Sequence, residues 1–458
     1  MEVHHLVSAT DIHKWAEEQH ARVNFPELIR RLILATSNPH EIEFRAQEGT
    51  DYGGWDGLTK TKEATAFVPK GSTGWELKCS KTPKRFANED YSKRTQDPSP
   101  LIAKDSTFIF CSGRRWKGKD NWKNDKQSEK EWDAIKVYDA DDIATWLSEA
   151  LGVHVWLSLL LGKPIETVED ISSWWKNWSS ITDPEISAGF LLSGRKKEFE
   201  EFRKLLKSDN GLYIIKSDST ENAISFISAS IEKLKVKEGK GFFAKTIVIY
   251  DPKSWNYFAS QHSPLILIPT FNKPQLFQKA TDNGHKVLFP VGNEYSLDVN
   301  INVSRLSSSI AQEILTKEGL PRIRARHFAG LARRSIYAYR RILSDKYTAI
   351  PKWANSENGI ELLPVILCGS WNEKNDGDRE FIEELTGSEY SKLKLLLLKW
   401  RDVPDAPFRF VDPIWTVNAK EDGRSQESNA TSSPKGDIAL CRNRNELPVM
   451  NVNISGIN

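Results

Sequence analysis

GGWDG at residues 53–57 and STGWELKCS at residues 72–80 are the stretches that indicate how the front of this chain folds. The first is a tight glycine-rich turn that carries Asp56, and the second has the composition of a strand. Residues i and i+2 of a strand point to the same face, so Glu76 and Lys78 project together while Leu77 points into the core. With Asp56 at the end of a neighbouring strand, two carboxylates converge beside one ammonium.

Such a cluster contains the groups that phosphodiester hydrolysis needs. Carboxylates hold Mg²⁺ or Mn²⁺ through hard oxygen ligands. The metal polarises the phosphate and lowers the pKa of a bound water, and a lysine orients that water or stabilises the charge on the phosphate. Glu27 is a candidate further metal ligand, although an exposed acid at a helix start is the commoner role. A surface ion pair is the common alternative for E-x-K on a strand.

The surrounding sequence predicts an α/β domain that ends near residue 165. Apolar spacing predicts a helix over residues 11–36, with Asp11 as its N-cap and Pro26 in a first helical turn. Strands are predicted on both sides of the glycine turn, at residues 41–46, 64–69, 72–80 and 106–113. A second helix, with acids in its first turn, is predicted over residues 139–162.

A basic stretch follows the Glu76 strand directly. Residues 78–130 hold fourteen lysines and arginines against seven acids, with aromatic residues between them. A basic surface with interleaved aromatics suits the phosphate backbone of DNA, whereas a solvated loop surface is the ordinary alternative. The candidate DNA contacts are Lys81, Lys84, Tyr91, Lys93, Arg94, Arg114, Arg115 and Lys117.

Residues 1 to about 165 resemble a known family of nucleases. The segments that carry the resemblance are GWDG, FVPKGSTGWELK, NEDYSKRT, FIFCSGRRWKGKDNW and VYDADDIATWL. They are similar to the Mrr-like restriction-endonuclease domains at the front of large bacterial anti-phage proteins. The resemblance implies a PD-(D/E)xK fold that cleaves DNA, with Asp56 and Glu76 as metal ligands. Some relatives lack a lysine at the place of Lys78, which leaves Lys81 and Lys84 as alternative sources of the charge in this chain.

Residues 188–309 form a second predicted α/β domain, since strands at 211–217, 245–251, 264–270 and 286–292 alternate with helices. The turn KSDSTEN at residues 216–222 stands where a P-loop would stand, but it has no glycine to wrap a phosphate. Asp251 ends a strand at a Walker-B position, where a loop cap is the commoner role. The segments GHKVLFPVG, GLPRIRARHFAGLARRSIYAYRRIL and IPKWA resemble the degenerate STAND-type module of the same defence proteins. The resemblance implies oligomerisation or switching in place of ATP hydrolysis, with no bound cofactor.

The rest of the chain divides into three further regions. Residues 166–187 are predicted to be a linker, residues 310–418 a helical, winged-helix-like region, and residues 419–458 a disordered polar tail. Eight basic residues and one acid lie in 322–346, which is equally suited to contact DNA or to dock on another domain. The unpatterned tail also favours a truncated form of a longer protein.

Composition narrows the class of protein further. No apolar run approaches the ~20 residues of a membrane helix, and the start of the chain is not a secretory signal. The four cysteines form no C-x-x-C pair, which argues against zinc and is typical of a reducing cytoplasm. The sequence thus predicts a cytoplasmic, Mg²⁺-dependent endonuclease that acts on double-stranded DNA in defence and oligomerises through its STAND-like module. The alternative is a decayed nuclease that only binds DNA or acts as a scaffold.

Overall fold

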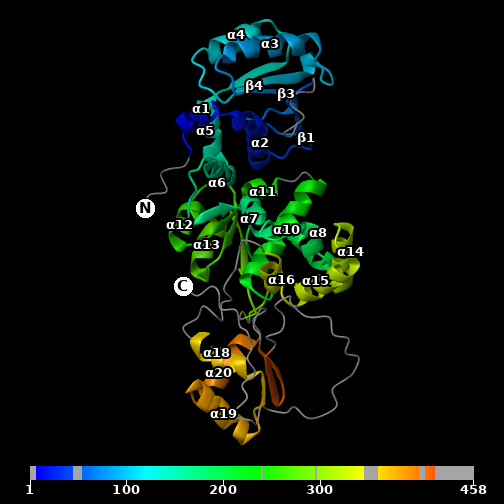
Figure 1. Cartoon of the computed structure of the whole chain (residues 1–458). Coiled ribbons are helices and arrows are strands. Elements are labelled where there is room, and N and C mark those ends of the chain that lie inside the picture. Colours follow the sequence, from blue (N-terminus) through cyan, green and yellow to red (C-terminus); the bar gives the residue numbers. More distant parts are fainter. Residues whose placement is uncertain are drawn as a thin grey trace. The chain divides into compact units, whose positions relative to one another are not determined.

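The computed structural model (Figure 1) describes residues 7–44, 54–238, 241–293, 295, 297–344, 359–401 and 408–417. The chain divides into two compact units, Met1–Arg334 and Ser335–Asn458. The first unit contains two sheets of five and six strands, and the second unit contains a sheet of three. In the described part of the chain, no helix has both the length and the apolarity that a membrane crossing requires.

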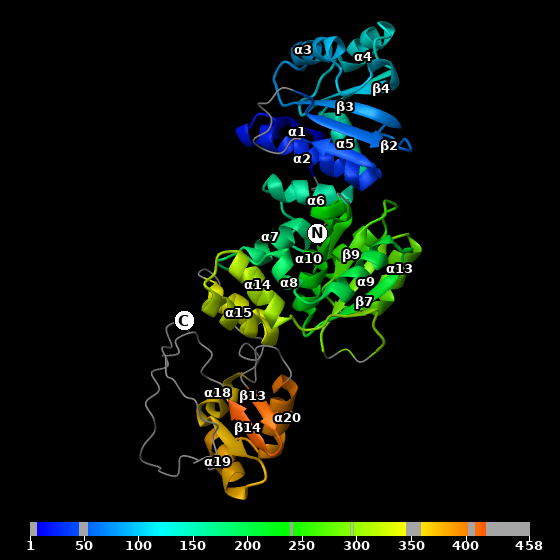
Figure 2. The ribbon, with the colours of Figure 1, turned by 90° about the vertical axis from the view of Figure 1, so that its right-hand side faces the viewer.

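The N-terminal domain of the first unit is a mixed sheet between two layers of helices. The sheet order is β1-β2-β3-β4-β5, antiparallel from β1 to β3 and parallel from β3 to β5. Helices α3 and α4 cover one face, and α1, α2 and α5 cover the other (Figure 2). The elements are α1 (Ala9–Trp15), α2 (Gln19–Thr36), β1 (Glu41–Phe44), β2 (Gly57–Thr61), β3 (Gly71–Lys78), α3 (Pro83–Gln96), β4 (Ser106–Ser112), α4 (Lys119–Ser128), β5 (Ala134–Tyr138), α5 (Ala140–Glu149) and α6 (Leu151–Leu160).

The strand predicted over residues 64–69 is wrong, because β2 lies earlier, at Gly57–Thr61. The segment 64–69 is instead an irregular loop in which Val68 and Pro69 are buried and Phe67 is half-buried. The ring of Phe67 stacks on Trp146 at 5.0 Å, and its carbonyl accepts a 2.7 Å hydrogen bond from the Tyr138 hydroxyl. Apolar residues in this loop therefore imitate the composition of a buried strand.

The predicted helices are present but are each divided in two. Residues 11–36 form α1 and α2, and Pro26 lies inside α2 rather than in a first turn. The N-cap is Ser8, and Asp11 is the third helical residue that completes its capping box. The helix predicted over 139–162 divides at Ala150, whose φ of −128° and ψ of 60° end α5.

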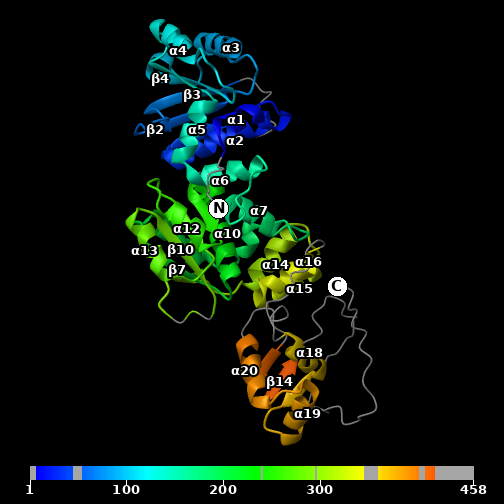
Figure 3. The same cartoon turned by 90° about the vertical axis from the view of Figure 1, so that its left-hand side faces the viewer.

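The second domain of the first unit is built on a sheet of order β11-β7-β10-β9-β8-β6, parallel except for β6. Helices α7 and α10 lie on one face, and α12 and α13 on the other (Figure 3). This alternation confirms the predicted parallel α/β sheet. The elements are β6 (Val168–Asp170), α7 (Ile171–Ser179), α8 (Ala188–Leu191), α9 (Lys196–Lys207), β7 (Leu212–Lys216), α10 (Thr220–Glu238), α11 (Phe242–Lys245), β8 (Thr246–Ile249), α12 (Pro252–Ala259), β9 (Ile266–Pro269), α13 (Pro274–Asp282), β10 (Lys286–Val291), β11 (Ile301–Asn302), α14 (Ser308–Lys317) and α15 (Arg322–Arg334).

Residues 166–187 are not a linker. Strand β6 pairs with β8 and forms the antiparallel edge of the second sheet. Asp170 then caps α7 by accepting hydrogen bonds from the backbone of Ser172 and Ser173, both at 3.1 Å. The aromatic residues of this segment belong to the domain, since Trp174 and Trp178 are buried and stacked at 5.8 Å.

The two domains of the first unit meet at Arg31, a buried residue of α2. Its guanidinium lies 4.3 Å from the centre of the Trp156 ring and 4.9 Å from that of Phe243. One of its nitrogens is 3.7 Å from the Asp170 carboxylate. A cation between two rings with a buried carboxylate as partner ties α2 and α6 to α11 and β6.

The second unit combines helices with a small antiparallel sheet of order β12-β14-β13. Gly387, with φ 67°, ends α19 in the left-handed conformation and begins the short turn into α20. Trp371 and Trp415 stack at 5.9 Å in the core. The elements are α16 (Ile336–Leu343), α18 (Gly359–Cys368), β12 (Ser370–Asn372), α19 (Asp376–Thr386), α20 (Tyr390–Arg401), β13 (Phe408–Val411) and β14 (Ile414–Val417).

In this unit α19 and α20 are joined by a short turn and are followed by the β13–β14 hairpin. The boundaries of the unit differ from the predicted 310–418, since α14 and α15 belong to the first unit. The predicted disordered tail, 419–458, lies outside the described residues.

Candidate active site

The pairing of β2 with β3 brings Asp56 to Glu76 and Lys78. Gly57 pairs with Trp75, so Asp56 lies beside the next residue of β3. The Asp56 Oδ2 atom accepts hydrogen bonds from the Leu77 backbone at 2.8 Å and from Lys78 Nζ at 3.1 Å. The turn itself depends on glycine, because Gly54 has a φ of 132°.

Glycine is also required on the neighbouring strand, where Trp55 crosses β3. A Cβ atom on Gly74 would lie 2.4 Å from the Trp55 ring. The ring is thereby buried against Phe108 and Trp132, at centroid distances of 5.9 and 5.7 Å. This packing fixes the residue that directly precedes Asp56, so the turn is held by the core beneath it.

Lys78 lies at the centre of three carboxylates. Its Nζ atom is 3.1 Å from Asp56, 3.5 Å from Glu76 and 3.5 Å from Asp90. Lys81 and Lys84, the alternative lysines, are exposed on the segment that follows β3. Lys78 is therefore the lysine placed to act with the two acids.

Asp90 was not among the predicted site residues. It lies on α3 with its Oδ2 atom buried and without a hydrogen bond in the described part of the chain, although the Lys78 ammonium faces it. The signal was present in the spacing of Ala87, Asp90, Tyr91 and Arg94, which is that of one helix face. That face packs toward the sheet, so an acid within it comes to lie beside β3.

Arg94 holds Glu76 from the side opposite Lys78. Its Nε donates to Glu76 Oε1, and its terminal nitrogen donates to the Gly54 carbonyl. The guanidinium also lies 4.9 Å from the centre of the Trp55 ring. Arg94 was predicted to contact DNA, but it is buried, so it is a positioning residue that links the Asp56 turn to Glu76.

The electrostatics of the cluster favour protonation of one acid in the absence of a cation. Burial, together with the nearby charges of Asp56 and Asp90, raises the pKa of Glu76 to about 8, and Lys78 and Arg94 oppose that shift. Burial also raises the pKa of Asp90. The pKa of Lys78 is raised because the three carboxylates outweigh its burial, so the ammonium stays charged.

The donor set suits Mg²⁺, which proteins commonly bind through one or two carboxylates together with water and substrate phosphate. Asp56 and Glu76 supply such a pair, and the buried Asp90 oxygen adds an acceptor that no hydrogen bond satisfies among the described residues. In that same part of the chain, no three acidic, histidine or cysteine side chains form a complete metal cage. The arrangement therefore fits a two-carboxylate site and not a cage made by protein alone.

Glu27, the proposed further ligand, has other partners. Its carboxylate binds Arg31 at 2.8 Å and Arg30 at 3.3 Å. Arg31 is the cation at the seam between the two domains. Glu27 thus serves that contact, and we do not include it among the metal ligands.

The predicted DNA contacts divide into exposed and buried residues. Tyr91 packs edge-on against Phe108 and Trp122, and Arg114 is buried against Glu17. Burial argues against direct contact with DNA for these two residues, as it does for Arg94. Arg115 is exposed and pairs with Asp141 at 3.0 Å. The other exposed candidates are Lys81, Lys84, Lys93 and Lys117.

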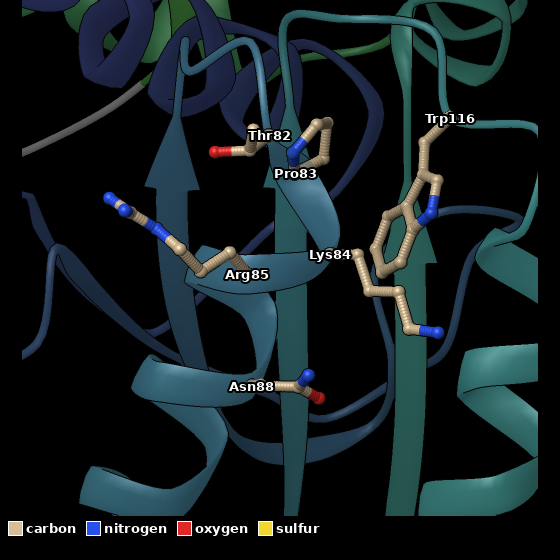
Figure 4. Close-up of a pocket in the computed structure, with 6 residues that line it drawn as sticks. All are labelled: Thr82, Pro83, Lys84, Arg85, Asn88 and Trp116. Atoms are coloured by element: carbon tan, nitrogen blue, oxygen red, sulfur yellow. The ribbon is translucent and has the colours of Figure 1, made fainter.

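A pocket of about 480 Å³ lies at the start of α3, directly after the strand that carries Glu76 and Lys78. Figure 4 shows Lys84 and Trp116 on one side of it and Arg85 extending to the other. The pocket is lined by Thr82, Pro83, Lys84, Arg85, Asn88 and Trp116. Lys84 and Arg85 are exposed and give the pocket a positive charge that suits a phosphate, whereas the Trp116 ring is buried against Phe110 and Trp122.

The turn between β7 and α10 carries a serine that caps the helix. Ser219 caps α10 by accepting a 3.2 Å hydrogen bond from the Asn222 backbone. Asp251 caps α12 in the same way, with bonds from Lys253 and Ser254 at 2.8 and 3.1 Å. Both positions therefore have the ordinary capping role.

The basic segment 322–346 contains the helices α15 and α16. Arg322, Arg324 and Arg326 are exposed on α15, whereas Arg340 of α16 is buried. Lys346 lies outside the described residues. Comparison with known proteins gives no identification, since no family model and no curated protein matches this chain.

Proposed function

We propose that the N-terminal domain is a metal-dependent deoxyribonuclease with Asp56, Glu76 and Lys78 as its catalytic residues. The observation that carries the proposal is the position of the Lys78 ammonium, within 3.5 Å of three carboxylates from β3, α3 and the turn before β2. Metal-dependent hydrolysis of a phosphodiester uses a bound divalent cation together with a positive charge fixed beside it. The resemblance to Mrr-like endonuclease domains supports the same assignment.

Each residue of the proposed active site has its own role in hydrolysis. Asp56 and Glu76 would hold Mg²⁺, which supplies an activated water and polarises the phosphate when bound. Lys78 carries a lasting positive charge that orients the water and stabilises the developing charge on the phosphate oxygens. Arg94 fixes Glu76, and Asp90 holds the Lys78 ammonium from the side of α3.

Double-stranded DNA is the substrate that the surrounding surface favours. Lys81, Lys84, Lys93 and Lys117 are exposed, and Lys84 belongs to the pocket at the start of α3. Lysines at such positions neutralise phosphates whatever the base sequence. We propose that the protein acts on foreign DNA in defence, and that the parallel-sheet domain is a STAND-like switch that does not hydrolyse ATP and forms oligomers.

The test is cleavage of supercoiled plasmid by the full chain. We expect nicked or linear DNA with Mg²⁺ or Mn²⁺ and none after chelation with EDTA, with activity returning when metal is added back. A protein that binds the plasmid in a mobility-shift assay but leaves it intact under all metal conditions would be a DNA-binding scaffold with a decayed site.

The raised pKa of Glu76 predicts a pH dependence for this activity. A carboxyl with a pKa of about 8 carries a proton at neutral pH, and the proton competes with the metal for the same oxygens. At limiting Mn²⁺ we therefore expect the cleavage rate to rise with pH up to about 8 and then to level off. Saturating Mn²⁺ should move this rise to lower pH. A rate at limiting Mn²⁺ that is flat from pH 6 to 9 would show that Glu76 is ionised without the metal.

A further inference from the structure

A cavity of about 570 Å³ lies inside the first unit, between the end of α2 and the second sheet. It opens at the edge where the parallel strands begin, since its lining residues precede β7 or stand at the starts of β8, β9 and β10. Its lining contains three lysines and one histidine and no acidic side chain. A hollow of this size with cations in its wall is a site for an anion.

Lys245 is the cation of the cavity that lacks a counter-ion among the described residues. It lines the cavity and is half-buried, and in the part of the chain that the structure describes it has no hydrogen bond or ion pair. Burial alone lowers its pKa, because no charge nearby opposes the shift. A desolvated ammonium without a counter-ion is costly, and an anion in the cavity would remove that cost.

Lys286 adds a second positive charge that is held in place by the backbone. Its Nζ atom donates to the carbonyls of Leu205 at 2.6 Å, Leu206 at 3.2 Å and Ser208 at 2.9 Å. These bonds use its three hydrogens. Burial lowers the pKa of Lys286 to about 8, and the nearby charge of Asp209 opposes that shift. Lys286 therefore attracts an anion by its field, while Lys245 has donors to offer it.

The rest of the cavity lining indicates which chemical groups the ligand has besides the anion. Leu34, Pro39, Phe242 and Ile266 provide apolar surface, and Asn210 is one of several polar side chains between them. Such a lining binds an apolar or aromatic body and fixes its orientation through a few polar contacts. Two lysine charges match the dianion that a phosphate monoester carries near neutral pH.

We propose that this cavity binds a small phosphate monoester with an aromatic body, of the size of a nucleoside monophosphate. The site is separate from the position of a P-loop, which would lie beyond the other ends of the strands, after Lys216 of β7. It is also separate from the Asp56 and Glu76 cluster. The proposal therefore does not depend on the nuclease function.

The probe is adenosine 5′-monophosphate, titrated into the full chain by calorimetry. We expect one site per chain, and weaker binding by at least about tenfold in Lys245→Gln, since a buried charge pair would lose its cation. Lys245→Arg, which keeps the charge, should bind more tightly than Lys245→Gln. Lys253→Gln is the matched control, because Lys253 is an exposed lysine of α12 and should bind as the wild type does.

Three results would overturn the proposal. They are the absence of binding by the wild type at millimolar adenosine monophosphate, equal affinity of the wild type and Lys245→Gln, and equal affinity for inorganic phosphate, which cannot use the apolar walls. Photolabelling of the wild type with 8-azido-adenosine monophosphate covers the case in which the variants do not fold. Label in peptides from residues 34–40 or 241–266 supports the site, and label only elsewhere contradicts it.

Discussion

Glu76→Gln is expected to abolish metal-dependent DNA cleavage while leaving the fold intact. The amide keeps the size of the side chain but cannot bind the cation as a carboxylate does. Replacing a residue that only supports a metal ligand already lowers metal affinity or activity by about 10- to 100-fold. We therefore expect Glu76→Gln to lower the cleavage rate by at least about 100-fold. Plasmid nicking at saturating Mg²⁺ measures the effect, and circular dichroism checks the fold.

Glu89→Gln is the matched control for this variant. Glu89 is next to Asp90 on α3, but its side chain is exposed and pairs with Arg85 at 3.4 Å. The Glu89→Gln variant should cleave plasmid DNA at the wild-type rate. If Glu76→Gln retains full activity, or if Glu89→Gln loses as much, the acid cluster around Lys78 is not the catalytic site.

Arg94→Met is expected to destabilise the protein more than any other single change at the site. Removing one partner of a buried ion pair leaves the other charge uncompensated and costs about 3–5 kcal/mol. Here the carboxylate left behind is Glu76, which is 1% exposed. The loss relative to the wild type should grow as pH rises above about 8, because wild-type Glu76 then ionises beside Arg94, whereas the folded variant must either keep the proton or bury an unpaired charge. Urea unfolding at pH 6 and pH 9.5 measures both effects.

A second substitution separates this stability effect from catalysis. In Arg94→Met combined with Glu76→Gln no charge is left unpaired between the two positions, so the double variant should recover much of the lost stability. It should remain inactive, because the metal ligand is absent. Lys93→Met is the control, since Lys93 is an exposed neighbour on the same helix. Additive losses in the double variant would show that Arg94 stabilises the fold without acting through Glu76.

The strand that carries the site could be predicted because side chains in a strand alternate between two faces every second residue, a pattern visible in a few neighbouring residues. Glu76 and Lys78 lie together for that reason, and Asp56 joins them through the register of β2 with β3. Asp90 could not be predicted with equal ease, since its place depends on how a polar helix packs on the sheet. The burial of Arg94 was unpredictable too, because arginine is almost never fully buried unless it is paired.

The errors in the fold have a related cause. Residues 64–69 are apolar because Phe67 and Val68 fill the core from a loop, and composition alone does not distinguish this from a strand. Residues 166–187 were taken for a linker, yet β6 gains its partner from β8, about eighty positions along the chain. Pairings between distant segments leave little trace in local sequence.

The contact at Arg31 has a consequence for the modularity of the chain. A fragment that ends near residue 165 would keep Arg31 and Trp156 but lose Phe243 and Asp170. The cation would then face water on one side, with an apolar helix surface exposed around it. The N-terminal domain is therefore not an independent module. If it were fused to another protein, that protein would have to supply both an aromatic ring and an acid beside Arg31.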